Sequence, residues 1–191
     1  FELSWTHSQV FLRRLDATES DAQLYERLAG QILYSSPALR APRSVIARND
    51  RGQSALWAYA ISGDLPIALL RIADHQQLPL VRQMVQAHAY WRLKGLQTDL
   101  VIWNEDPSGY RQALHEGIMG VIATLGAAEL CDRPGGIFLR RSDQVSEEDK
   151  ILLQTAARLI VVDSEGTLAE QLCRRQAVLA AAPPFVGTAQ Q

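Results

Sequence analysis

The sequence predicts a mixed α and β fold that is rich in helix: a helical N-terminal part followed by a small α/β part with a three-stranded parallel sheet. Apolar residues at helical spacing mark the first half, most clearly over 78–94. The apolar run 99–104 is bounded by polar residues, as is typical of a strand buried on both faces. Strand-like and helix-like segments then alternate, which favours βαβ units and a parallel sheet.

Size and composition agree with a globular chain. It has 191 residues, 47% of them hydrophobic, enough to bury a core. The net charge of −2 offers no clustered basic field, so we expect no nucleic acid as a partner. No apolar run reaches the roughly 18 to 20 residues of a membrane span, so we expect no direct membrane contact. Cys131 and Cys173 lie far apart in sequence and are interpreted as free thiols in a reducing compartment.

The first elements are helices. Ser20 and Gln23 match a capping box, and an apolar stripe on Leu24, Leu28 and Ile32 follows it. This pattern predicts a helix that ends near residue 34, after which two prolines indicate a loop. A second helix is predicted over 78–94, where Lys94 and Gly95 provide a stop. His88 lies on the apolar face of that helix and is interpreted as a satisfied core residue.

Between these helices lies the most informative stretch, ARNDRGQSALWAYAISGDLPIALLRI at 47–72. It contains an apolar segment at 56–61, a polar turn at 62–66 and a second apolar run at 67–70. Such a pattern indicates two apolar elements joined by a sharp turn.

The second half predicts strands at 99–104, 136–140 and 159–162. Helices are expected at about 107–125, at 146–157 and from Thr167, which forms a capping box with Glu170. We therefore divide the chain into a helical part (1–97), a small α/β part (98–182) and a Pro/Ala-rich tail or linker (183–191).

Three residues of the 47–72 stretch are candidates for substrate binding: Gln53, Trp57 and Asp64. The Asp64 carboxylate can reach a cavity from its turn, but Asp-Leu-Pro is also typical of a helix N-cap, and the cap is the favoured interpretation. Trp57 can stack on a sugar face, although half-buried core is the commoner fate of such a residue. The Gln53 amide can bind hydroxyl groups or hold its own loop together.

No catalytic or metal site emerges from the sequence, and no cofactor is expected. The four histidines show no ligand spacing, and the chain has no phosphate-binding glycine loop and no G-x-S-x-G elbow. Parallel sheets bind ligands at the carboxyl ends of their strands. That edge would carry polar residues: Asn104, Glu105, Asp106, Arg141, Asp143, Asp163 and Ser164.

With these residues in view, nearly the whole chain resembles a segment of the cyclic β-1,2-glucan synthases. The resemblance lies in their C-terminal region, which is related to the family 94 glycoside phosphorylases, formerly glycosyltransferase family 36. The matching stretches are 5–15, 24–42, 47–72, 80–105 and 132–161. The first residue is Phe1 and not Met, so we expect the chain to be part of a longer parent polypeptide.

The resemblance implies a parent enzyme that makes and trims β-1,2-glucan, a glycosyltransferase with a phosphorylase-like region. It implies contacts with the parent's β-supersandwich and (α/α)₆ barrel domains, a cytoplasmic location, and anchoring of the parent in the inner membrane through other regions. This chain has no stretch that resembles the barrel's catalytic Asp motif. Asp64 therefore does not inherit the general-acid role.

Two hypotheses follow. In the first, the chain is a non-catalytic structural segment of such a synthase, a candidate for contact with β-1,2-glucan, and only the parent is an enzyme. In the second, it is an independent small α/β enzyme acting on a sugar phosphate or a nucleotide, as the polar strand ends would allow. The missing phosphate loop counts against the second.

Overall fold

The computed structural model describes residues 10, 12–34, 37–106 and 111–180, so the expected tail at 183–191 lies outside the described residues. Four parallel strands form one sheet in the order β3-β2-β1-β4. The strands are β1 (Ile67–Ile72), β2 (Asp99–Asn104), β3 (Ile137–Arg141) and β4 (Ala157–Val162). The α-helices are α2 (Glu19–Leu33), α3 (Arg43–Ile46), α4 (Leu78–Leu93), α5 (Arg111–Thr124), α6 (Glu147–Ala156) and α7 (Leu168–Ala180).

The mixed, helix-rich character is confirmed, but the three-stranded sheet is wrong because β1 is a fourth strand. β1 is central: it pairs with β2 on one side and with β4 on the other. Five of its six residues are buried, because helices cover both faces of the sheet. The strand therefore lacks the alternation of apolar and polar residues that identifies a half-exposed strand in a sequence. The sheet thus draws its central strand from the part expected to be helical, and the expected boundary near residue 97 falls between α4 and β2.

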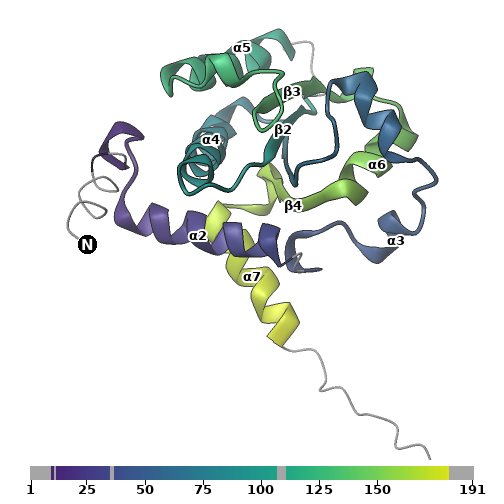
Figure 1. Cartoon of the computed structure of the whole chain (residues 1–191), viewed down its shortest axis with the longest axis horizontal. Helices are drawn as coiled ribbons and strands as arrows, with labels where there is room; N and C mark the ends of the chain where they lie inside the picture. Colours follow the sequence, from purple (N-terminus) through teal and green to yellow (C-terminus); the bar gives the residue numbers. More distant parts are fainter. Residues whose placement is uncertain (1–9, 11, 35–36, 107–110, 181–191) are drawn as a thin grey trace, which may run out of the picture.

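Helices cover both faces of the sheet in three layers. The chain passes from β1 through α4 to β2 and through α5 to β3, moving outward along one half of the sheet. It then returns through α6 to β4, on the other side of β1. In Figure 1, α4 lies on one side of the strands, whereas α3 and α6 lie on the other.

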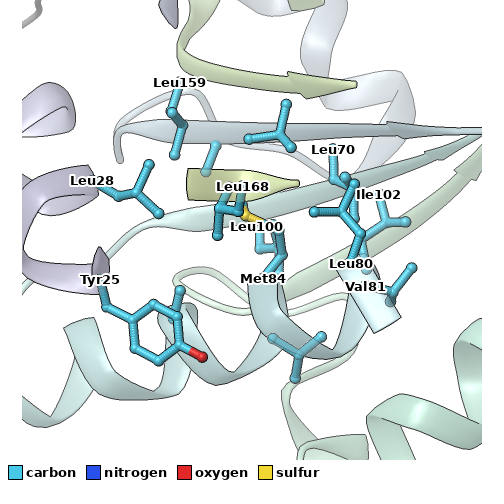
Figure 2. Close-up of a cluster of buried hydrophobic side chains, with 14 of the residues drawn as sticks. Tyr25, Leu28, Leu70, Leu80, Val81, Met84, Leu100, Ile102, Leu159 and Leu168 are labelled. Atoms are coloured by element: carbon cyan, nitrogen blue, oxygen red, sulfur yellow. The ribbon is translucent and has the colours of Figure 1, made fainter. Parts of the chain in front are cut away.

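Each face has its own apolar core. On one face, alternate strand residues such as Leu70 and Leu100 pack with side chains of α2, α4, α5 and α7, and Figure 2 shows Tyr25, Met84 and Leu168 converging on this cluster. On the other face, residues such as Leu69 and Val101 pack with α6 and the segment 41–61. Both cores include residues of strand β1.

Helix ends follow their local hydrogen bonds. The helix α2 has a capping box, but its members are Thr18 and Asp21, two positions before the predicted pair. At α7 the predicted pair is confirmed: the Thr167 amide donates to Glu170 Oε2 (2.8 Å), and the Glu170 amide donates to Thr167 Oγ1 (3.3 Å). Gly95 follows α4 with φ of 85°, the left-handed conformation that glycine tolerates.

His88 is a core residue, as predicted, but it is only partly satisfied, because its Nδ1 has no hydrogen-bond partner among the described residues. Its side chain is fully buried on α4, and its Nε2 lies 2.9 Å from the carbonyl oxygen of Thr98, the residue before β2. Burial lowers the pKa of His88 to about 4. Asp99, also buried, accepts a hydrogen bond from the Gly135 amide (2.7 Å), and burial raises its pKa.

The His88 environment predicts a loss of stability in acid. The unfolded chain binds a proton at His88 near pH 6.5, whereas the folded chain resists protonation down to about pH 4. The contribution of His88 to the free energy of unfolding is therefore fully present above pH 6.5 and is lost as the pH falls towards 4. Between pH 7 and pH 5 the loss should be about 2 kcal/mol. Urea unfolding at both pH values should show this loss, and His88→Gln should reduce it. The exposed His75→Gln variant is the control; an equal pH slope in all three proteins would contradict the assignment.

Candidate functional site

The three predicted binding residues come together at one turn on the amino-terminal side of β1. Gln53 and Trp57 lie on a 3₁₀ helix, η2 (Gln53–Tyr59), and Asp64 lies in the turn that leads into β1. The Ser62 carbonyl is the centre of the arrangement. It accepts from Gln53 Nε2 (2.9 Å) and from Trp57 Nε1 (3.2 Å).

Asp64 does not cap a helix, contrary to the favoured interpretation. Its Oδ1 accepts a second bond from Gln53 Nε2 (3.0 Å), and its amide donates to Ser62 Oγ (3.2 Å). Pro66 precedes β1 and not a helix. The Asp-Leu-Pro pattern suits a turn into a strand as well as a helix start, because proline fixes φ in both settings. The polar groups of Gln53 and Asp64 thus stabilise their own turn.

Trp57 is not part of the core, contrary to expectation. Its side chain is 65% exposed, although its indole N–H is held by the Ser62 carbonyl. An indole anchored at its polar edge and open on its surface is a suitable platform for stacking against a flat apolar ligand face.

Beside the turn lies a hollow of about 310 Å³. Gln53, Gly63 and Asp64 form one wall, and residues from the end of α6 and the start of β4 form the other. From that second wall, Arg158 donates to the Ile32 carbonyl (3.3 Å). The buried Thr155 hydroxyl has no partner among the described residues. No local sequence pattern marks Thr155 or Arg158, because it is the pairing of β1 with β4 that places them beside the turn.

At the opposite edge of the sheet, where the strands end, an aspartate side chain bonds to the backbone just after the neighbouring strand. Asp163, directly after β4, is 9% exposed, and its Oδ2 accepts from the backbone amides of Ala73 (2.7 Å) and Asp74 (3.0 Å), directly after β1. In doubly wound sheets this position, between strands that lead in opposite directions, is where ligands bind. Here the Asp163 carboxylate accepts the hydrogen bonds of the backbone amides that would otherwise bind an anionic ligand.

The neighbouring strand ends gather polar residues as predicted, in a hollow of about 230 Å³ that includes Asn104, Glu105, Asp106, Arg141 and Asp143. Several of these charges are neutralised within the protein. Arg71 pairs with Glu105 (3.0 Å), and Arg141 pairs with Asp143 (2.8 Å). In the part of the chain that the structure describes, no group of three or more His, Cys, Asp or Glu residues could hold a metal ion. Both cysteines are free thiols, as predicted.

Comparison with known proteins identifies a relative of this chain. The chain is 35% identical over 172 residues to the cyclic beta-(1,2)-glucan synthase NdvB of Rhizobium meliloti (strain 1021). The chain is related to a segment of a cyclic β-(1,2)-glucan synthase. The resemblance inferred from the sequence is thereby confirmed.

The aligned region covers 90% of this chain but 6% of the synthase NdvB. No protein-family model matches the chain. Among the described residues, no helix combines the length and the apolar character needed to span a membrane.

The turn around Ser62 predicts a strict requirement for glycine at position 63. Gly63 has φ of +77°, and a Cβ there would lie 2.8 Å from Gln53 Cγ. Gly63→Ala should lower the free energy of unfolding by about 1 to 3 kcal/mol, because it adds backbone strain to a steric conflict. Urea denaturation measures the effect. Gly52→Ala, at a negative φ with no atom within 4 Å of the added Cβ, should change it by less than about 0.5 kcal/mol; equal effects would contradict this account of the turn.

The Asp163 bridge predicts a second stability effect. Asp163→Ala leaves two amides at the carboxyl edge without their acceptor and should cost about 2 to 3 kcal/mol in urea unfolding. Asp163→Asn keeps a carbonyl oxygen as an acceptor and should cost less. The exposed Asp50→Ala serves as the control. If Asp163→Ala were as mild as Asp50→Ala, the bridge would not stabilise the sheet.

Proposed function

We propose that the chain is a non-catalytic structural segment of a cyclic β-1,2-glucan synthase that contacts glucan through Trp57 and the adjoining hollow. The relationship to the synthase NdvB supports the context. The single observation that carries the glucan contact is the 65% exposed Trp57 indole, fixed by its hydrogen bond to the Ser62 carbonyl.

The chemistry of the turn supports a binding role over a catalytic one. The Gln53 amide donates to both Ser62 and Asp64, and the Trp57 N–H donates to Ser62. These hydrogen bonds hold the turn and the indole in place. Hydrolysis of a glycosidic bond by paired carboxylates requires one acid and one base on either side of that bond, and the groups of this turn do not supply such a pair. A sugar ring would stack on the indole, while hydroxyl groups reach Asp64 and Arg158, which line the hollow.

The alternative, an independent enzyme acting on a sugar phosphate or a nucleotide, is less well supported. Phosphate groups bind at backbone amides near the carboxyl ends of parallel strands. The amides of Ala73 and Asp74 are already bonded to Asp163. A phosphate there would have to displace a nearly buried carboxylate.

In the parent, the module would pack between the β-supersandwich and (α/α)₆ barrel domains, in the cytoplasm, with other regions anchoring the polypeptide in the inner membrane. These assignments follow from the resemblance to the synthases. The parent would carry the glycosyltransferase and phosphorylase-like activities.

Titration of the chain with linear β-1,2-glucan tests the binding role through tryptophan fluorescence. Of the tryptophans that the structure describes, Trp91 and Trp103 are buried and Trp57 is exposed, so a saturable change is expected from Trp57. Trp57→Ala should abolish that change and weaken binding, measured by calorimetry, at least about fivefold, since stacking contributes about 1 kcal/mol. The 86% exposed Tyr34, changed to alanine, is the control.

No saturable response in the unmodified chain would leave a purely structural role. Phosphorolysis or hydrolysis of β-1,2-glucan by this chain, abolished by Asp64→Asn, would overturn the non-catalytic assignment.

A further inference from the structure

A second hollow lies on the carboxyl side of the sheet, between the starts of α4 and α7. Its volume is about 390 Å³, and its walls come from Gln77, Arg82 and Gln83 at the start of α4, from Gly166 and Thr167 before α7, and from Asp16 and Asp21. We call it the α4/α7 crevice. It is separate from the Trp57 turn, which lies at the amino side of β1.

The topology puts this crevice where an open α/β sheet binds its ligands. Strand β1 leads into α4 and strand β4 leads into α7. These strands are neighbours at the point where the strand order reverses, with β2 and β3 on one side of β1 and β4 on the other. Residues at the starts of both helices line the hollow, and ligands of open α/β sheets bind near such strand-to-helix connections.

The hydrogen-bonding groups of the crevice are only partly used by the protein. The side-chain amides of Gln77 and Gln83, both half-buried, have no hydrogen-bond partner among the described residues. Gln86, which also lines the crevice, has hydrogen-bond partners for its side-chain amide: its Nε2 donates to the Leu15 carbonyl (2.6 Å) and its Oε1 accepts from Tyr25 (3.1 Å). Two amides, each with a donor and an acceptor, therefore remain for a ligand.

The charges in the crevice disfavour an anion. The Arg82 guanidinium is paired with Asp16 (3.3 Å), and the carboxylate of Asp21 adds a second negative charge. The amides that follow β1 are bonded to Asp163 and cannot cradle a phosphate. Unpaired amides beside carboxylates match the alternating donors and acceptors of sugar hydroxyl groups.

We propose that the α4/α7 crevice is a binding site for a neutral saccharide, held by the amides of Gln77 and Gln83. The choice of β-1,2-glucan as that saccharide rests on the proposed function; the neutral, polyhydroxylated character of the ligand rests on the crevice itself. The site is independent of Trp57, so the chain has two saccharide contacts on opposite edges of one sheet.

The test is an NMR titration of the ¹⁵N-labelled chain with a linear β-1,2-gluco-oligosaccharide, and separately with inorganic phosphate. The saccharide should shift the amides of residues 77, 78, 80–83 and 166–167 in a saturable manner, and phosphate should not. The double variant Gln77→Ala/Gln83→Ala should weaken binding at the crevice about tenfold, as expected for the loss of two hydrogen bonds. Gln76→Ala, an exposed neighbour outside the crevice, should leave it unchanged.

Trp57→Ala separates the two sites in the same titration. If the crevice shifts persist in Trp57→Ala and the double variant folds normally, the crevice assignment is upheld even if the Trp57 contact fails. Saccharide shifts confined to the Trp57 turn would overturn the crevice site while supporting the proposed function. Saturable shifts at the crevice with phosphate, or none there with the saccharide, would also overturn it.

Discussion

The pairing of β1 with β4 is the constraint on which the rest of the molecule depends. It brings a strand from near residue 160 beside one from near residue 70, and it forces the connection through α6 to cross to the opposite face of the sheet. Both apolar cores, the hollow beside Asp64 and the α4/α7 crevice exist because of this pairing. Asp163 ties the pair together at its carboxyl end, where its side chain accepts from two amides that follow β1.

The same arrangement supports the proposal of a binding role. At the amino side of β1, Gln53 and Trp57 donate to the Ser62 carbonyl, so their polar atoms fix the turn while the indole surface stays open. At the carboxyl side, Asp163 supplies internally the negative charge that a phosphate ligand would bring. The open indole surface at one edge and the α4/α7 crevice at the other are the surfaces to which the proposed saccharide contacts are assigned.

Much of this could be predicted from the sequence, and the failures have physical causes. Helix α4 and the strand β2 followed from periodicity and from a bounded apolar run. Strand β1 was missed because Ile67–Ile72, covered on both faces, has no alternation and is too short to distinguish from helix. Asp64 was misassigned as a cap because Asp-Leu-Pro marks a turn before either element. The Asp163 bridge and the crevice depend on the strand order, which no local pattern encodes.

The central claim is that the Asp163 side chain links the carboxyl ends of β1 and β4 by accepting hydrogen bonds from two backbone amides. Amide hydrogen exchange at residues 73 and 74 tests this claim most directly. Both amides lie in a loop and would exchange rapidly if they faced only solvent. Their bonds to a nearly buried carboxylate predict protection close to that of the amides within β1, and Asp163→Ala should remove it while the β1 amides stay protected. Rapid exchange at Ala73 and Asp74 in the unmodified chain would contradict the account.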